Sequence, residues 1–96
     1  MTEIKLFKIA GEFAENKDFA RDVRIQKIIP ELDKGGEIIL DFEGVRGATQ
    51  SFVHALISDL LRNYGCEVLD KISFKNCNEI VQKIINIVVE YMQESD

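Results

Sequence analysis

Hydrophobic and polar positions along the chain follow two different spacings, and each change of spacing marks a new predicted element. Apolar runs of strand length, two of them loosely alternating, predict strands over residues 4–9, 37–42 and 67–74. Apolar residues three and four apart predict helices over residues 18–33, 51–63 and 77–93. Strands alternating with helices are typical of an α/β domain, here one with a mostly parallel sheet and right-handed crossover helices.

Local signals predict where the helices begin and end. Asp18 is the predicted N-cap of the first helix, because its carboxylate can accept a hydrogen bond from a free backbone N–H. Pro30 lacks an N–H, so it is predicted to end or kink that helix. Asn76 followed by Glu79 three residues later resembles a capping box before the last helix.

Apolar residues that share a face of an element are the predicted core. Ile39, in the middle of the central strand, is predicted to be buried. The last helix carries one broad apolar stripe, made of Ile80, Val81, Ile84, Ile85, Val88, Val89 and Met92. Ile87 and Tyr91 lie just outside this stripe, which leaves room for a contact with a partner or a second copy.

Length and charge narrow the possible functions. The 96 residues predict one domain over residues 1–96. Twelve basic and seventeen acidic residues give a net charge of −5, which argues against nucleic-acid binding. No apolar run approaches the roughly 18 residues of a membrane span, and the first residues lack a signal-peptide pattern, so a cytoplasmic protein is expected. Cys66 and Cys77 lack metal-site spacing and are expected to be free, inert thiols.

In parallel α/β sheets, function tends to lie beyond the carboxyl ends of the strands. The segment from Gly44 to Ser51 follows the central strand and occupies that position. Gly44 and Gly47 are predicted to adopt positive φ, and their spacing matches neither a P-loop nor a dinucleotide-binding motif. Arg46 is a candidate anion ligand, and Thr49 and Ser51 are candidate caps of the next helix.

Two sets of polar residues that could bear on catalysis lie in or near this segment. Ser51 and His54 are three residues apart and share the polar side of the second helix with Ser58 and Arg62. A nucleophile–base pair also needs an orienting third group and an oxyanion site, for which the sequence gives no sign. Asp41 ends the central strand, and its side chain is expected to bond the following loop. We therefore predict that the chain is not an enzyme and needs no cofactor.

Residues 38–52, IILDFEGVRGATQSF, are similar to the signature of STAS domains, the fold of bacterial anti-sigma factor antagonists. In that signature an apolar strand ends in Asp, a valine follows four residues later, and a small polar cluster opens a helix. The chain resembles still more closely a STAS-like family of unknown function. Its shared segments are GEFA at 11–14, LDFEGV at 40–45, Ser-Phe at 51–52 and an Asn-rich turn at 76–78, which together span nearly the whole chain.

The resemblance implies a STAS-like fold and a regulatory protein partner. In the antagonists, the first hydroxyl of the polar cluster is phosphorylated by a partner kinase of the GHKL ATPase fold. Counting from Val45 places Thr49 at the Asp of that cluster, Gln50 at the phosphorylated Ser and Ser51 at the next hydroxyl. Glutamine cannot be phosphorylated, so Ser51 or Thr49 is a candidate phosphoacceptor only with a shift of one residue.

These observations lead to one main hypothesis and two alternatives. The main hypothesis is a non-catalytic signalling module that docks, through residues 44–58, on a GHKL-type ATPase or kinase or on an anti-sigma factor. The alternatives are a small-ligand or nucleotide sensor that holds an anion near Gly47–Ser51, and a structural dimerisation domain. Asp41 and Asn76 are predicted structural or switch residues. The predicted partner-binding residues are Gly44, Arg46, Gly47, Thr49, Gln50, Ser51, His54 and Ser58.

Overall fold

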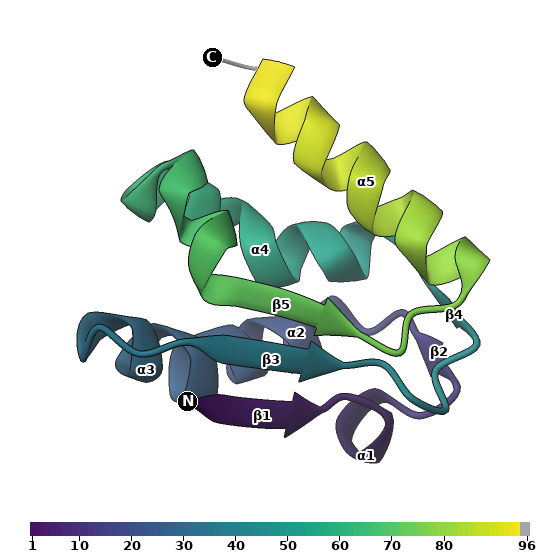
Figure 1. The fold of residues 1–96 in the computed structure, drawn as a ribbon. Coiled ribbons are helices and arrows are strands. Elements are labelled where there is room, and N and C mark those ends of the chain that lie inside the picture. The colour runs from purple at the N-terminus through teal and green to yellow at the C-terminus, as the bar shows by residue number, and fades with distance from the viewer. Residues whose placement is uncertain (95–96) are drawn as a thin grey trace.

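Three parallel strands form the central sheet of the computed structural model, which describes residues 1–94. The strands β1 (Thr2–Lys5), β3 (Ile38–Asp41) and β5 (Ile72–Lys75) lie in the order β1-β3-β5, with β3 in the centre (Figure 1). Both neighbouring pairs are parallel. Parallel neighbours need crossover connections, and helices supply them here. The predicted α/β class with a parallel sheet is confirmed.

Helices cover one face of this sheet and leave the other face open. Behind the sheet in Figure 1 lie α2 (Lys17–Val23) and α4 (Gln50–Tyr64), and α5 (Glu79–Glu94) crosses over α4. Side chains that point toward the helices are buried, among them Ile4, Leu40 and Ile72. The alternate positions Glu3, Lys5, Ser73 and Lys75 are exposed.

The open face explains why one predicted core residue is not fully buried. Ile39 points away from the helices and is only half-buried, between Glu3 and Ser73 of the neighbouring strands. Near it, Lys75 Nζ lies 3.3 Å from Glu3 Oε2 in an ion pair that crosses the sheet. The prediction that Ile39 is a core residue was wrong, because a central strand can be apolar on both faces while only one is covered.

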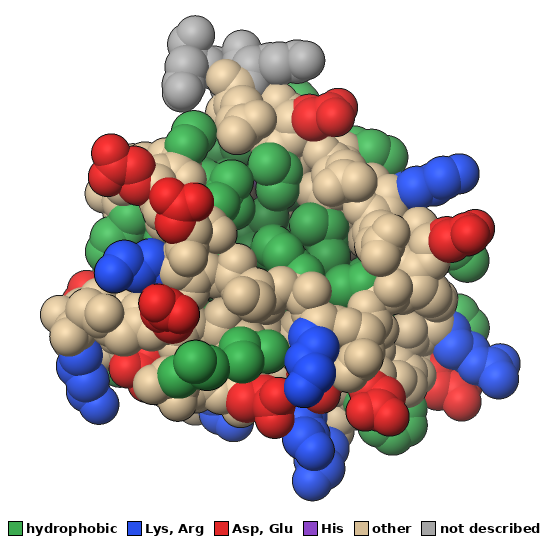
Figure 2. Space-filling view, in the orientation of Figure 1, with side chains coloured by type: hydrophobic (Ala, Val, Ile, Leu, Met, Phe, Trp, Pro, Cys, Tyr) green, Lys and Arg blue, Asp and Glu red, His purple; other side chains and the backbone are tan. Residues whose placement is uncertain are grey.

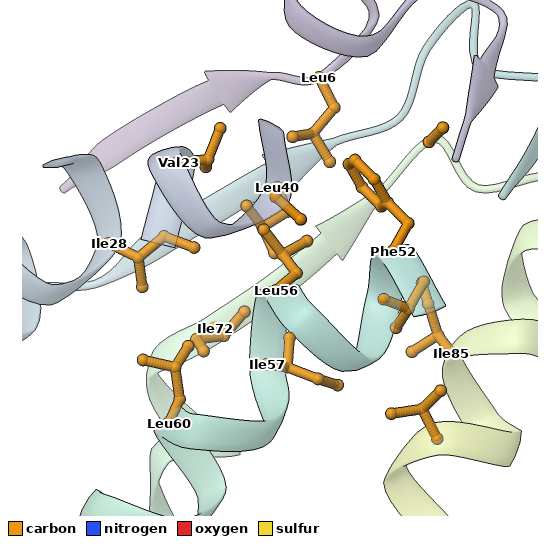
Figure 3. Close-up of a cluster of buried hydrophobic side chains, with 14 of the residues drawn as sticks. Leu6, Val23, Ile28, Leu40, Phe52, Leu56, Ile57, Leu60, Ile72 and Ile85 are labelled. Atoms are coloured by element: carbon orange, nitrogen blue, oxygen red, sulfur yellow. The ribbon is translucent and has the colours of Figure 1, made fainter. Parts of the chain in front are cut away.

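The core fills the space between the sheet and the helices. Figure 3 shows side chains from the strands, α2, α4 and α5 converging on one cluster. The long helix α4 contributes most of its apolar positions to this cluster, because residues three and four apart lie on the same face. The labelled members are Leu6, Val23, Ile28, Leu40, Phe52, Leu56, Ile57, Leu60, Ile72 and Ile85.

The outer strands are shorter than their apolar runs predicted. The first strand ends at Lys5, and the next residues form the single-turn helix α1 (Phe7–Ala10). The third strand begins only at Ile72, because Cys66–Lys71 forms a 3-10 turn. Val68 and Ile72 are four residues apart, a spacing that a helical turn satisfies as well as a strand does.

The first long helix continues beyond its proline. Asn16, and not Asp18, is its N-cap, and Asn16 Oδ1 accepts a hydrogen bond of 2.9 Å from the Asp18 N–H. A π-helical turn at Arg24–Ile28 leads into α3 (Ile29–Asp33), which contains Pro30 in its first turn. The wider turn accommodates the missing N–H of the proline, so the helix is distorted at this point and does not end.

The last helix differs from its prediction at its start and on one side. Asn78 caps α5 through a hydrogen bond of 2.8 Å from the Val81 N–H to Asn78 Oδ1, so the capping box predicted from Asn76 and Glu79 does not form. Ile80, predicted to be core, is 59% exposed. The residues of α5 that are buried in the core are Val81, Ile85, Val88 and Met92.

Candidate functional site

The loop between β3 and α4 is held in place by a short second sheet. In this sheet β4 (Gly47–Ala48) pairs in parallel with β2 (Phe13–Ala14). Just before it, the Arg46 N–H donates a hydrogen bond of 2.7 Å to the Glu12 carbonyl. Sequence analysis missed both strands, because two residues are too few to form a pattern. This pairing gives the start of α4 a fixed position.

The two glycines of the loop have different roles. Gly44 has φ +89°, and a Cβ added to it would lie 2.8 Å from the ring of Phe7, so both its conformation and its packing require glycine. Gly47 does not have positive φ, which makes that prediction wrong. It pairs with Phe13 as part of β4, and the Phe13 ring lies beside it.

The start of α4 places one polar side chain in a structural role and leaves its neighbours available. Thr49 is the N-cap, and its Oγ1 accepts a hydrogen bond of 3.0 Å from the Phe52 N–H. Gln50 and Ser51 begin the helix and are exposed, and neither side chain forms a hydrogen bond within residues 1–94. Capping therefore explains Thr49 but does not explain Gln50 or Ser51.

A groove of about 500 Å³ runs between the first turns of α4 and the outer half of α5. Its α4 wall is polar, formed by Gln50, Ser51 and the half-buried His54. Its α5 wall is largely apolar, and Ile87 and Tyr91 there are 45% and 64% exposed. The remaining lining residues are Lys17 and Ala55, which sequence analysis did not single out, and Val88, which it assigned to the apolar stripe of the last helix.

The other predicted site residues lie elsewhere. Gly44, Arg46 and Asn76 border an open depression of about 490 Å³ at the carboxyl edge of the sheet. Gly47 and Thr49 border a smaller one of about 190 Å³ with the exposed Phe13 and Ile80. The structure therefore distributes the predicted surface over three adjoining depressions.

Ser58 was predicted to bind a partner, and this prediction was wrong. The side chain lies on the same side of α4 as Ser51 and His54, but Ser58 is only 3% exposed. Both α2 and α5 pack against α4, whereas Gln50, Ser51 and His54 in its first turns line the groove. The position of α5 is a tertiary feature that the periodicity of α4 does not contain.

On the face drawn in Figure 2, hydrophobic side chains gather in a hollow. A separate depression beside α5 has both polar and apolar lining residues. The residues that line this depression of about 230 Å³ are Phe74, Cys77, Gln82, Ile85 and Asn86. None of the predicted site residues lines it. The groove beside α4 is therefore the stronger candidate site.

Asp41 ties together the loops at the carboxyl edge of the sheet. It is 4% exposed, and its Oδ1 accepts hydrogen bonds of 2.9 Å from Asn76 Nδ2 and from the Glu43 N–H. These bonds, the one from Asn76 first, hold the pKa of Asp41 below its ordinary value. The two loops are further joined by Asn78, whose Nδ2 donates to the Arg46 carbonyl at 2.8 Å.

Acid should remove the stabilisation that the Asp41 carboxylate contributes. Its pKa is lower in the folded chain than the unfolded value of about 3.9, so the contribution is complete above that value and is lost as the pH falls through the folded pKa. Asp41→Asn has no carboxyl group here, so its difference in unfolding free energy from wild type should shrink between about pH 6 and about pH 2. Urea unfolding of both proteins measures this difference. If the difference in unfolding free energy between the two proteins stays constant with pH, the pKa of Asp41 is not lowered in the folded chain.

The remaining polar groups show no assembled catalytic arrangement within residues 1–94. Ser51 and His54 line the same groove, but no hydrogen bond joins them. No group of three or more His, Cys, Asp or Glu side chains in this range could hold a metal ion. Both cysteines are free; Cys66 is exposed, and burial, followed by the charge of Asp41, raises the pKa of the Cys77 thiol.

Among the described helices, none is both long and apolar enough to cross a membrane.

Comparisons with known proteins identify the family. Searches of curated proteins and of solved structures found no match. The sequence model of one family, described as a STAS-like domain of unknown function, matches residues 21–82, about two thirds of the chain and all of β3, α4 and β5. The chain belongs to this family of STAS-like domains.

Proposed function

We propose that the chain is a non-catalytic regulatory module that docks on a protein partner through the groove between α4 and α5. The observation that carries the proposal is the pairing of two kinds of wall in one groove. Gln50 and Ser51 offer hydrogen-bonding groups that the described chain does not use, and they face the exposed apolar side chains of Ile87 and Tyr91. Exposed apolar surface with a polar rim is typical of protein–protein contact sites.

The energetics of such a groove favour docking of a protein surface. Covering a large apolar side chain fully is worth about 1.5–3 kcal/mol, and tyrosine is among the residues that most often dominate binding energy. The residues that line the groove belong to helices that pack against one another in the fold, α2, α4 and α5. A partner can therefore bind without waiting for these walls to become ordered.

The partner class follows from the resemblance to anti-sigma factor antagonists. Proteins of that kind dock on GHKL-type kinases and anti-sigma factors through the segment that corresponds to residues 44–58. We extend this role to the present chain, as a partner-switching module of the bacterial cytoplasm. The docking residues at the centre of this surface are Gln50, Ser51 and His54, with Gly44, Arg46, Gly47 and Thr49 around them.

Ser51 is the better of the two candidate phosphoacceptors. The Thr49 hydroxyl already accepts the capping hydrogen bond, whereas the Ser51 hydroxyl is exposed on the groove wall. A phosphate adds a charge of about −1.5 to −2. Placed beside Ile87 and Tyr91, this charge would have to be desolvated under a partner, so phosphorylation of Ser51 would release the partner.

Site-specific photo-crosslinking in the native host tests the proposal. A photo-crosslinking amino acid at position 54 lies in the groove, and the same amino acid at position 73 lies on the open face of the sheet. We expect one protein to be crosslinked from position 54 and not from position 73. The purified chain should then bind that protein, identified by mass spectrometry as a GHKL-type ATPase or kinase or an anti-sigma factor.

Two outcomes would overturn the proposal. Equal crosslinking from both positions would mean that the chain contacts proteins without using the groove. Crosslinking only from position 73 would place the docking surface on the open face of the sheet.

A further inference from the structure

Two apolar stripes run side by side along α5. Val81, Ile85, Val88 and Met92 form the first and are buried in the core. The second stripe consists of Ile80, Ile84, Ile87 and Tyr91, and its residues follow the same intervals of four, three and four. Three of these four side chains are 45% or more exposed, and Ile84 is half-buried. Ile84 also packs partly against the core, whereas most of the surface of Ile80, Ile87 and Tyr91 is left outside it.

The spacing of the second stripe is that of a helix–helix contact. Intervals of four and three are the repeat at which one helix presents a continuous seam to another. The helix has 16 residues and is about 24 Å long, so the stripe extends over nearly its whole length. A surface loop or an extended peptide would not require this periodicity.

We propose that this stripe pairs with the same stripe of a second copy of the chain, with the two α5 helices antiparallel. In a two-fold contact every residue pair occurs twice, and the axis would pass between Ile84 and Ile87. Ile80 of one copy then faces Tyr91 of the other, and Ile84 faces Ile87. Each of the four side chains gains an apolar neighbour.

Charges beside the stripe fit this arrangement. Lys83 and Glu90 are exposed on the side of the stripe away from the core, and neither forms an ion pair within residues 1–94. In the antiparallel pair, Lys83 of one copy lies within about 3 Å, measured along the helix axis, of the level of Glu90 of the other. The pairing thus creates two equivalent contacts between opposite charges. A parallel pairing would instead place Lys83 of one chain level with Lys83 of the other, and Glu90 level with Glu90.

The stripe is narrow, which sets the expected strength of the pairing. Stable interfaces bury about 800 Å² on each partner, and one helix face supplies less than that. We therefore expect a dissociation constant in the range of about 10–500 µM.

Because Ile87 and Tyr91 also line the groove beside α4, a paired chain would cover one wall of that groove. The pairing itself does not depend on the proposed function, because the purified chain alone tests it.

Sedimentation equilibrium of the purified 96-residue chain, from about 10 µM to about 1 mM, measures the pairing. We expect a monomer–dimer equilibrium that Ile87→Glu weakens at least tenfold. Ile25→Glu is the matched control, because Ile25 is 46% exposed, nearly the same as Ile87, but lies in the π-helical turn before α3. Ile25→Glu should leave the equilibrium unchanged.

A charge exchange tests the orientation. Lys83→Glu and Glu90→Lys should each weaken the dimer, and the double variant should restore it, because opposite charges face each other again. These surface changes leave the core intact, so they keep the test decisive even if Ile87→Glu fails to fold. A chain that stays monomeric at 1 mM, equal effects of Ile87→Glu and Ile25→Glu, or a double variant without rescue would each overturn the proposal.

Discussion

Replacing Leu40 with alanine should lower the free energy of unfolding by about 2–5 kcal/mol, whereas the same change at its neighbour Ile39 should cost clearly less. Leu40 points from the central strand into the space between the sheet and the helices and is fully buried (Figure 3). Removing its side chain leaves a cavity that the surrounding core can only partly fill. Ile39 points to the open face, where solvent fills the space that its side chain leaves.

Urea denaturation of the two variants and the wild type measures this difference. Both changes lie in the same strand and replace a four-carbon side chain with alanine, so the number of carbon atoms removed is matched. The dependence of the unfolding free energy on urea concentration should stay the same in both, because the fold is unchanged. A larger loss for Ile39→Ala than for Leu40→Ala would mean that the opposite face of the sheet is the covered one.

The order of the three strands of the central sheet and of the long helices between them could be predicted from the sequence, because it depends on local patterns. Each apolar run is long enough to be assigned to a strand or a helix, and parallel strands joined by helices follow from that order. The ends of the outer strands could not be predicted. Residues 67–71 have apolar positions that suit both a strand and a 3-10 turn, and only their packing beside α4 selects the turn.

The sequence predicts that polar side chains cap the first and last long helices, but it does not identify which residue forms each cap. Asn16 and Asp18 are both good cap residues two positions apart, and so are Asn76 and Asn78. In the structure, Asn16 caps α2 and Asn78 caps α5, because these are the residues that directly precede the first turn of each helix. Asn76 instead donates a hydrogen bond to the buried carboxylate of Asp41. Asp41 is distant in sequence, so a local pattern cannot predict this contact.

The candidate site could be predicted only in part. The loop and the start of α4 were found from the sequence, because they follow the central strand and carry unusual polar residues. The opposite wall of the groove belongs to α5, more than 30 positions later in the chain. Its contribution depends on how α5 packs against α4, and no pattern within either helix contains that angle. The burial of Ser58 likewise comes from tertiary packing and not from the pattern of α4.

Exchanging Ser51 for aspartate should leave the fold intact and weaken binding of the crosslinked partner about tenfold or more. The residue occupies the second position of α4, where a negative charge favours the helix dipole, so stability should not fall. Under a partner, the carboxylate would have to lose water beside Ile87 and Tyr91, which costs several kcal/mol when the charge stays unpaired. Lys17 lines the same groove and offsets part of that cost, so a loss near tenfold is expected rather than complete loss.

Two further variants separate docking from charge alone. Ser73→Asp adds the same charge to an exposed serine on the open face of the sheet and should bind as wild type. Gln50→Ala adds no charge and leaves the Thr49 cap in place, so it should fold normally and lose only the contacts of its amide, about 0.5–1.5 kcal/mol of binding free energy. Isothermal titration calorimetry measures all three affinities. If Ser51→Asp binds as well as Ser73→Asp, the start of α4 lies outside the interface, and Thr49 needs no role beyond its cap.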